Sequence, residues 1–524
     1  MDAPVAAQQR PAWRVVLGLA LALPAFILLL TSYVEPLVWT VRSSFQRLTV
    51  IRSAAGPDVG FDNYGDVFKA GLGGAFGRAL LLAVVPLLVV LLLAPVLAWL
   101  AHRGGPAGRW AARGLLALPL AAYAPTAAAA GPVAAAADEP GGGVPSVLGV
   151  YWLTGFGLAA ALGVTLYLAA LRRRSLTGPL VAAAIGGLAV VAVALQSFTV
   201  PFIVGDDRQG QTPATVMYQQ AFVYGRFGTA AAVSTVLLLA LLVFGLAATL
   251  LLILTRTRLE YDDERPAPSP PNYVFLAAVG GLTIAVLVVS WLGLGDWLTR
   301  ITDSREPSAD IAGVSVGVNT WLPPVISAGV GVTVAALAAA GISGLRPLGR
   351  HSEWLLLPFG LFLFVGVTPL AVRAFAAGQT AGRLDSFIGL IPPTRVAIPA
   401  LVVLALLVRG QVRRREEAAA RGQAVSWART ILPAAPMLLL AYLVTWFVES
   451  QDLVWGLLSG YGEHADAQTY LAQALRDMQY RTFGRLPFDT VLPLWALILL
   501  ILLAGAAQLL YLDRVALKAG RRDE

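Results

Sequence analysis

A charged segment from Arg413 to Pro433 has the residue types and spacing that best suit binding to a partner protein. Its apolar positions recur at roughly helical spacing, and they are Ala418, Ala419, Gly422, Val425 and Trp427. Its polar surface consists of Arg415, Glu416, Glu417 and Arg421. A helix of this kind can dock in a groove of a partner. The segment also suits a solvated connector, because cytoplasmic loops of membrane proteins collect positive charge. Both interpretations stay open on these residues alone.

Polar and aromatic side chains inside apolar runs form a second group with a possible chemical role. Such groups are costly in a membrane unless they face protein or water, so they mark a candidate path for a solute. Hydroxyl, amide and aromatic groups suit a sugar-like ligand. The candidates are Gln196, Ser197, Thr199, Tyr123, Thr126, Thr445 and Trp446. Each of them also suits helix packing or an interfacial position, which is the alternative interpretation.

Other kinds of chemistry lack the residues that they need. The chain has no cysteine and its 3 histidines are scattered, so we expect no metal site and no thiol chemistry. ATP binding by a Walker A loop needs the pattern GxxxxGK[ST], and neither Lys69 nor Lys518 lies in one. We therefore expect no catalytic residue, no bound cofactor and no ATPase site in this chain.

The composition indicates a membrane protein. Hydrophobic residues make up 57% of the 524 positions and charged residues 13%, which is outside the range of soluble globular proteins. A helix that crosses a bilayer needs about 20 apolar residues, and this length predicts an all-α polytopic membrane protein with about twelve transmembrane helices. The expected spans lie near residues 14–34, 79–101, 114–137, 149–171, 180–204, 230–254, 273–294, 321–345, 354–376, 393–409, 430–448 and 490–512.

The distribution of arginine predicts how these spans are oriented. Clusters of arginine follow the second, fourth, sixth, eighth and tenth expected spans, and all of these loops lie on one side of the membrane. The positive-inside rule then places both termini in the cytoplasm. Because the positive charge is spread over short loops beside apolar runs, the net charge of +8 indicates topology and not nucleic-acid binding.

The stretch from Thr255 to Asn272 divides the chain into two parts. It is charged and then proline-rich, so we expect a semi-rigid linker that does not pack. Residues 1–254 form a first half and residues 273–524 a second half, each with about six spans. Two halves of the same topology are expected of a duplication or of a fusion of related subunits. An even number of spans also divides equally by coincidence, so shared motifs are needed to decide.

Short motifs in both halves carry a family resemblance. The first half contains VGFDNYGDVF (Val59 to Phe68), ALQSFTVPFIVG (Ala194 to Gly205) and TPATVMYQQAFVYGRFGTAAAVS (Thr212 to Ser234). The second half contains NTW (Asn319 to Trp321), GRLDSFIGLIPP (Gly382 to Pro393), ESQDLVWGLL (Glu449 to Leu458), TYLAQAL (Thr469 to Leu475) and DRVALKAG (Asp513 to Gly520). In this order the two sets resemble the first and second permease subunits of binding-protein-dependent ABC importers of the maltose and glycerol-phosphate type, fused head to tail.

The resemblance implies a multi-pass permease in the bacterial inner membrane that carries a sugar or a sugar-like solute. It also implies a separate cytoplasmic ABC ATPase dimer that uses ATP, and an extracytoplasmic solute-binding protein. That binding protein would dock on the longer outer loops, near residues 35–78, 205–229, 295–320 and 449–489. Gln196 matches a glutamine position that is common in the family.

In that family the loop before the penultimate span holds the EAA motif, a short coupling helix that docks on the ATPase. The segment 413–433 resembles this loop, and the resemblance assigns ATPase coupling to Glu416, Glu417, Ala418, Ala419, Gly422, Trp427 and Pro433. The segment is shorter than the family pattern, and Arg421 stands where an aspartate is common. The equivalent first-half loop, Arg172 to Pro179, has no glutamate and no room for such a helix. We therefore expect asymmetric coupling through the second half.

Two other classes of protein remain as alternatives. A proton-coupled secondary transporter also has two sets of spans joined by a long central loop, but it usually carries ionisable residues at mid-membrane, which are scarce in this sequence. A membrane-embedded glycosyltransferase would use acidic residues of an outer loop, such as Asp58, Asp62 and Asp66. Those three residues lie in and beside the first of the motifs that carry the permease resemblance.

Overall fold

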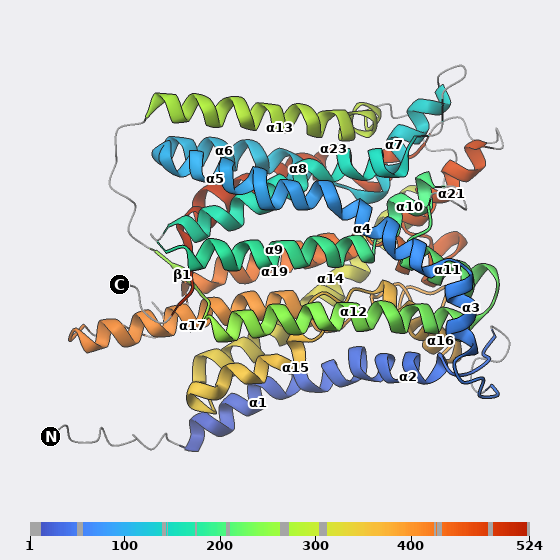
Figure 1. Ribbon diagram of the computed structural model, residues 1–524, viewed down its shortest axis with the longest axis horizontal. Helices are drawn as coiled ribbons and strands as arrows, with labels where there is room; N and C mark the ends of the chain where they lie inside the picture. The colour runs from blue at the N-terminus through green and yellow to red at the C-terminus, as the bar shows by residue number, and fades with distance from the viewer. Residues whose placement is uncertain are drawn as a thin grey trace.

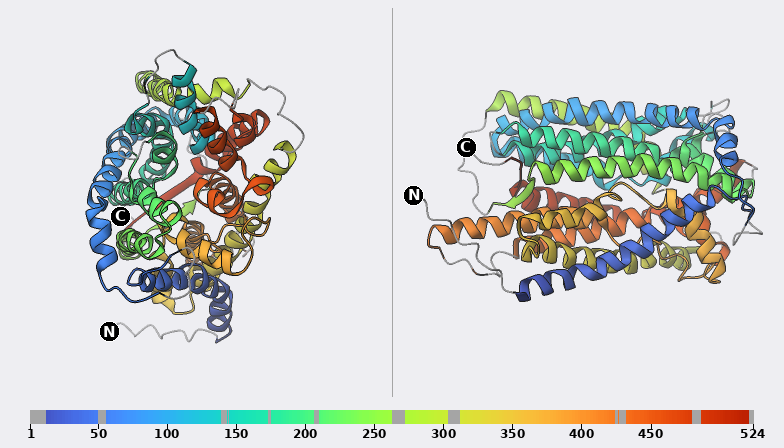
Figure 2. Two further views of the ribbon diagram at one scale, coloured as in Figure 1. Left: turned by 90° about the vertical axis from the view of Figure 1, so that its right-hand side faces the viewer. Right: turned by 60° about the horizontal axis from the view of Figure 1, so that its bottom comes forward.

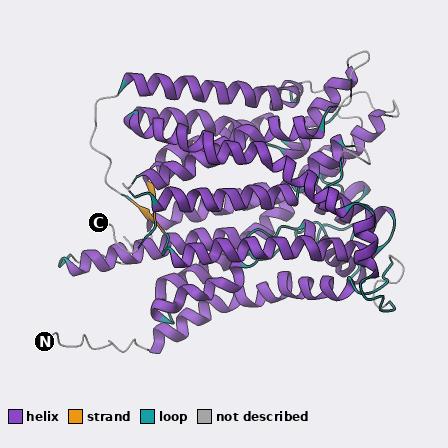
Figure 3. Cartoon of the chain, in the orientation of Figure 1, coloured by secondary structure: helices purple, strands orange, loops and turns teal. Residues whose placement is uncertain are grey.

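The protein is described from a computed structural model that covers residues 12–49, 56–138, 143, 145–172, 175–205, 210–262, 272–302, 312–423, 426, 432–479 and 486–520. It is a bundle of long helices with one small sheet at one end (Figures 1 and 3). Within these residues, 9 helices are long and apolar enough to cross a membrane. The expected all-α polytopic membrane protein is therefore confirmed.

The first half runs from an N-terminal helix to a short strand. Its helices are α1 (Ala12–Leu29), η1 (Leu30–Val34), α2 (Glu35–Ser43), α3 (Asp62–Lys69), α4 (Leu72–Leu88), η2 (Val89–Leu93), α5 (Ala94–Arg103), α6 (Gly105–Ala121), α7 (Pro125–Asp138), α8 (Val147–Leu171), α9 (Thr177–Leu195), α10 (Thr199–Val204), α11 (Pro213–Tyr218), η3 (Gln219–Val223) and α12 (Phe227–Leu254). The strand β1 (Arg258–Tyr261) follows.

The second half also begins with a long helix and ends with a short strand. Its helices are α13 (Tyr273–Arg300), α14 (Ala312–Ala339), η4 (Ala340–Leu345), η5 (Gly349–Leu356), α15 (Leu357–Gly360), η6 (Thr368–Leu370), α16 (Ala371–Thr380), α17 (Ile398–Ala420), η7 (Leu432–Ala434), α19 (Ala435–Ser450), α20 (Leu453–Ser459), η8 (Gly462–His464), α21 (Ala467–Gln479), α22 (Phe488–Val491), α23 (Leu494–Ala506), η9 (Ala507–Tyr511) and η10 (Leu512–Arg514). The strand β2 (Val515–Lys518) follows.

The number of spans differs from the expected twelve in three places. The third expected span is a pair of helices, α6 and α7, which meet at a bend of 73°. The ninth, 354–376, is interrupted between α15 and η6. The tenth lies in α17, whose apolar run is cut short by Arg409 before the charged end of the helix. If the bent pair counts as one span, the described residues contain up to 10 spans.

The outermost helix of each half packs against the other half. α13 lies along α6, α7 and α8, whereas α1 lies along α14 and η4, at the opposite edge of the bundle (Figure 1). Glycines allow both contacts to be close. A Cβ atom at Gly293 would overlap the backbone of Leu153, and one at Gly341 would overlap the Gly18 carbonyl. This reciprocal exchange joins the two halves into one helical body.

The two strands form an antiparallel sheet in which Arg258 is opposite Lys518 and Tyr261 is opposite Val515. Each strand follows the last long helix of its own half and packs on a helix of the other half, β1 on α17 and β2 on α8. Residues 255–262 were expected to form part of an unpacked linker, and this expectation is wrong for them, because Thr257, Arg258 and Glu260 are buried. The proline-rich remainder, residues 263–271, lies outside the described residues.

The sheet marks one end of the bundle, which we call the sheet end. The charged end of α17 extends beyond the bundle on this side (Figure 2). The short helices α3, α11, α16 and α21 lie at the opposite end, which we call the far end (Figure 1). The described arginines that follow α5, α8, α12 and η4 lie at the sheet end, together with Arg514 and Lys518. Positive charge is thus concentrated at the sheet end.

Candidate functional site

A break between α9 and α10 places Gln196 where two halves of the chain meet. Gln196 is the residue that follows the last turn of α9, and its side chain reaches a non-helical stretch of the second half. The Gln196 Nε2 atom donates to the Phe364 carbonyl at 2.7 Å. The Gly366 backbone N–H donates to the Gln196 Oε1 atom at 2.8 Å. One amide side chain therefore satisfies both a donor and an acceptor of unwound backbone, which is obligatory where no water is present.

Ser197 and Thr199 lie at the same break, and both are half-buried. The Ser197 carbonyl accepts a hydrogen bond from the Thr212 hydroxyl at 2.7 Å, which ties the break to the start of α11. The Tyr151 side chain of α8 lies close enough to Ser197 and Tyr123 to interact electrostatically with both. Tyr151 therefore connects two of the predicted groups. The sequence gives only a weak signal for it, a single tyrosine in an apolar run.

The break between α6 and α7 contains the next two candidates. Tyr123 lies in the bend and is half-buried, and Thr126 lies in the first turn of α7. The Thr126 hydroxyl is fully buried and has no hydrogen-bond partner among the described residues. A buried hydroxyl without a partner is uncommon, because its desolvation is not compensated. The bend between α6 and α7 is therefore a second polar position within the bundle.

The last pair of candidates lies on α19 and contacts a different helix. The Trp446 indole Nε1 atom donates to the Trp321 carbonyl at 2.9 Å, and the two rings lie 5.4 Å apart. Thr445 is half-buried on the same helix. Among the described residues no hydrogen bond connects this pair to Gln196, Ser197 or Tyr123. The structure brings together the α6–α7 and α9–α10 groups through Tyr151, and leaves the α19 pair at a separate helix contact.

The predicted coupling segment begins as a direct continuation of α17. Glu416 to Ala420 form the last turns of this helix, which projects beyond the bundle (Figure 1). Arg413 pairs with Glu417 at 3.1 Å, and Arg346 lies 4.0 Å from Glu416. The helix ends before Gly422, whose φ of +77° suits a glycine that follows a helix. The first part of the segment is thus an extended helix end.

The described residues include only part of the rest of that segment. Trp427 lies outside the described residues, as do residues 424, 425 and 428–431. Pro433 lies in η7, and its carbonyl accepts a hydrogen bond from the Tyr511 hydroxyl at 2.7 Å. Of the predicted coupling residues, Ala418 is the one that is buried, whereas Glu416, Glu417 and Ala419 are exposed. The exposed carboxylates leave this end of α17 accessible to a partner.

A buried acidic cluster at the far end was not predicted. Glu449, Asp452 and Asp466 line a polar cavity of about 10 Å³, which is room for about one water molecule. Asp452 caps α20 by accepting from the Val454 N–H at 2.9 Å. Asp466 caps α21 by accepting from the Thr469 N–H at 2.8 Å. The spacing Asp466-x-x-Thr469 is a capping signal that sequence reasoning could have used.

The environment of this acidic cluster favours uncharged carboxyl groups. Burial raises the pKa of Asp466 to about 6, although its hydrogen bond from the Thr469 backbone N–H acts in the opposite direction. Burial also raises the pKa of Asp452. Several buried polar atoms around the cluster have no partner among the described residues, and they are Gln451 Oε1, Trp455 Nε1, Gln468 Oε1 and Thr469 Oγ1. The cluster is therefore polar but incompletely hydrogen-bonded.

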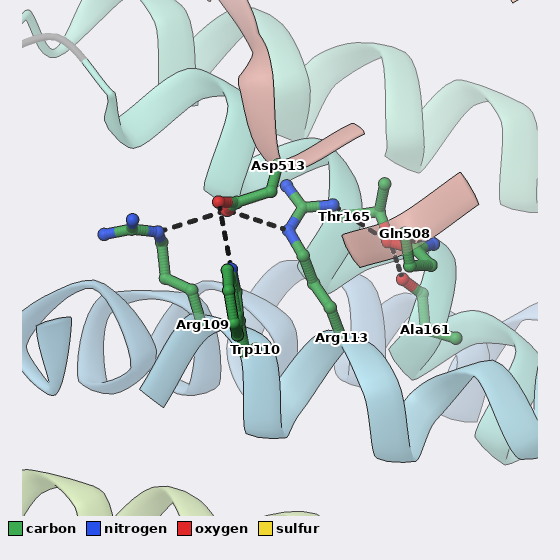
Figure 4. A network of polar contacts seen from close by, with 7 residues as sticks. All are labelled: Arg109, Trp110, Arg113, Ala161, Thr165, Gln508 and Asp513. Atoms are coloured by element: carbon green, nitrogen blue, oxygen red, sulfur yellow. Dashed lines mark hydrogen bonds and ion pairs between the residues drawn. The ribbon is translucent and has the colours of Figure 1, made fainter. Parts of the chain in front are cut away.

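An ion-pair network at the sheet end holds the C-terminal tail against the first half (Figure 4). Asp513 lies 3.1 Å from Arg109 and 3.6 Å from Arg113, and all three side chains are buried. The Trp110 indole N–H donates to the same carboxylate at 3.4 Å. Arg113 also donates to the Gln508 side chain at 2.8 Å. This network positions β2, so its first role is structural.

The described residues hold no group of three or more His, Cys, Asp and Glu side chains that could bind a metal ion. Comparison of the chain with protein-family models, with curated proteins and with solved structures finds no match.

Proposed function

We propose that this chain is the membrane-spanning permease of an ATP-driven importer for a sugar or a sugar-like solute. The chain would combine two permease halves, and ATP would be used by a separate ABC ATPase dimer on the sheet-end side, which would face the bacterial cytoplasm. An extracytoplasmic solute-binding protein would deliver the solute to the far end. The solute path would run along the breaks at Gln196, Ser197, Thr199 and Tyr123, with Thr445 and Trp446 as further contacts.

One observation carries this proposal. The charged end of α17, which resembles the EAA motif, projects from the bundle at the end that holds most of the described arginines. A helix that only crosses the membrane has no need of this extension, whereas a docking helix must reach beyond the bilayer. The broken spans support a transport role, because broken helices at the meeting of two repeats are a common site for a transported solute.

Co-purification and uptake test the proposal together. The chain is extracted in mild detergent from cells that carry its own ATPase, and ATPase bound at a fixed ratio is the expected result. Proteoliposomes of that complex are then assayed with a panel of radiolabelled sugars and glycerol phosphate, with ATP inside or with a non-hydrolysable analogue. Uptake that requires hydrolysable ATP supports the importer, and uptake by the chain alone contradicts it.

A proton-coupled secondary transporter is the second candidate, and the acidic cluster favours it. Asp466 has a pKa raised to about 6, close to the pH range in which proton coupling operates. The same proteoliposomes distinguish the two functions. An imposed pH gradient would drive uptake without ATP for a secondary transporter, and a protonophore would abolish it. ATP-dependent uptake that persists with a protonophore excludes proton coupling.

A further inference from the structure

A basic cavity at the sheet end lies beside the charged end of α17, and the function proposed above does not explain its concentration of arginine. Its volume is about 370 Å³, and it lies among the ends of α12 and η4, the start of η5 and the later turns of α17. Its basic lining residues are Arg256, Arg346, Arg350, Arg409 and Arg413. Its acidic lining residues are Glu353 and Glu416. The lining holds five guanidinium groups and two carboxylates. Glu417, outside the lining, pairs with Arg413 at 3.1 Å, so two positive charges remain in excess around the cavity.

The carboxylates are not placed to neutralise the arginines at the edge of the cavity. We call Arg256, Arg346 and Arg350 the rim. Glu353 pairs with Arg409 at 3.0 Å, and both side chains are nearly buried. This pair therefore belongs to the inner part of the cavity wall. Arg409 also donates to the Thr257 carbonyl at 3.1 Å. Glu416 lies 4.0 Å from Arg346, and its side chain is 61% exposed. A contact of that length and exposure is weak. The excess positive charge therefore belongs to the rim.

Two rim arginines adopt a backbone conformation that is unusual for their type. Arg256 has a φ of 51° and lies two residues after the end of α12. Arg346 has a φ of 52° and directly follows η4. Glycine or asparagine normally takes this position, because a side chain beyond Cα is strained there. Arg256 is exposed, and its guanidinium has no hydrogen bond or ion pair with any described residue. Fold stability does not account for arginine at this position.

We propose that this cavity binds a phosphate-bearing anion. Guanidinium groups bind phosphate through paired, charge-assisted hydrogen bonds, and several arginines facing one cavity repel one another unless an anion is present. The volume suits a small ligand or a headgroup. Two sources share this chemistry, an anionic phospholipid headgroup and a soluble phosphate compound. The inference does not depend on the proposed transport function, because it rests on the cavity alone.

The position of the cavity is compatible with both sources. It lies beyond the apolar parts of α12 and α14, where lipid headgroups meet water, and basic pockets between such helix ends bind anionic lipids. It is also open, because the rim residues Arg256 and Arg350 are exposed. A soluble ligand can therefore enter from the aqueous side.

Binding of inorganic pyrophosphate to the purified full-length protein tests whether the cavity binds a soluble phosphate compound. Calorimetry is carried out on the wild type and on Arg256→Gln and Arg350→Gln, which change exposed rim residues. Arg383→Gln is the matched control, because it removes one exposed arginine at the far end. We expect a dissociation constant about tenfold higher for each rim variant and an unchanged one for the control. Thermal unfolding without ligand shows that all variants are folded.

Retention of phosphatidylglycerol tests whether the cavity binds an anionic phospholipid headgroup. The same proteins are placed in nanodiscs of mixed phosphatidylglycerol and phosphatidylcholine, and the lipid that remains bound in detergent is counted by native mass spectrometry. Loss of phosphatidylglycerol in both rim variants, but not in Arg383→Gln, identifies the lipid as the source. Pyrophosphate binding without this loss identifies a soluble ligand. If neither probe binds, or if the rim variants bind both probes as the wild type does, the proposal is wrong.

Discussion

The two halves of this protein differ most where their equivalent helices end at the sheet end. In the first half, α8 ends at Leu171 and α9 starts at Thr177, so the connection is short. In the second half, α17 continues to Ala420 and α19 starts at Ala435. Yet a strand of the same sheet packs on each of these helices, β2 on α8 and β1 on α17. The bundle and its sheet are thus shared by the halves, and the difference is confined to the surface beyond them.

This contrast separates the parts that hold the halves together from the parts available to partners. The shared parts are buried and rich in paired charges, as in the contacts of Glu260 with Arg258 and Lys518. The part that differs, the end of α17, is exposed and makes weak pairs. Changes to the shared parts should therefore alter stability, and changes to the α17 end should alter function with little effect on stability.

Loss of the carboxylate in the sheet is expected to have the largest effect. Glu260→Ala leaves the buried charges of Arg258 and Lys518 without a partner, so we expect the free energy of unfolding to fall by about 3–5 kcal/mol. Asp262→Ala is the control, because Asp262 is 45% exposed and lies 3.4 Å from Arg414. That change should cost less than about 1 kcal/mol. Unfolding in detergent measures both free energies. Equal losses in the two variants would contradict a stabilising role of the buried carboxylate in the sheet.

The helix caps at the far end should respond differently to pH in the two halves. Asp466 caps α21, whereas Thr212 caps α11 at the equivalent position. Because the folded-state pKa of Asp466 is raised to about 6, the folded protein holds a proton that the unfolded chain has lost. The stabilisation is complete below the unfolded pKa and is lost as the pH rises through 6. The resulting decrease is about 3 kcal/mol.

Asp466→Asn keeps the cap but removes this titration. We expect the variant to lose the decrease in unfolding free energy between about pH 4 and pH 6 that the wild type shows. Thr212→Asn is the control in the first half, and its pH profile should match that of the wild type. Unfolding curves over this range measure the difference. Parallel profiles for Asp466→Asn and the wild type would show that Asp466 titrates normally.

Two glycines near the sheet differ in how closely they approach the neighbouring backbone, Gly410 of α17 beside β1 and Gly178 of α9 beside α8 and β2. A Cβ atom at Gly410 of α17 would overlap the Leu259 carbonyl of β1, so Gly410→Ala should lower the unfolding free energy by about 2 kcal/mol. A Cβ atom at Gly178 of α9 would lie 3.3 Å from the Ala170 carbonyl and 3.6 Å from that of Leu517. Gly178→Ala should cost less than about 1 kcal/mol, because alanine also favours the helix. Thermal unfolding ranks the two variants, and the reverse order would contradict the tighter contact at β1.

A lysine placed at the charged end of α17 or on the first-half connection gives the smallest effect on stability and tests the proposed coupling. Glu416→Lys should lower ATP-driven uptake by about tenfold, equivalent to about 1.4 kcal/mol of docking energy. The side chain of Glu416 is 61% exposed, so the unfolding temperature should stay nearly constant. Leu176→Lys is the control on the first-half connection, where Leu176 is 82% exposed. If both variants reduce uptake equally, coupling is not asymmetric.

Hydropathy predicted most of the helices but not their breaks. Helices such as α12 and α23 contain no charged residue along their whole length, so composition alone identifies them. The ninth expected span is as apolar as its neighbours, yet it is interrupted between α15 and η6. The unwound backbone there is stabilised by Gln196, which lies 168 residues away from Phe364 in the sequence. No local pattern in 354–376 contains that information.

The sequence indicated only some of the polar groups inside the bundle, for the same reason. Gln196 and the charged end of α17 were identified because their residue types are unusual for their surroundings. The acidic cluster was missed because Glu449, Asp452 and Asp466 are separated along the chain and resemble ordinary loop residues. The linker prediction failed at Arg258 and Glu260, since charged residues normally stay in solvent unless a partner compensates for their burial. Glu260 compensates for the burial of Arg258, and its other partner, Lys518, belongs to the C-terminal part of the chain.

By itself, the sequence determined that this is a polytopic helical membrane protein and which residues are concentrated at its arginine-rich end. Both properties are sums over local composition, because transfer into a bilayer depends on each segment separately. Tertiary structure alone decided that α1 and α13 exchange between the halves, that β1 pairs with β2, and that five arginines surround one cavity. These features depend on contacts between distant segments, and their energy arises only when the segments pack together.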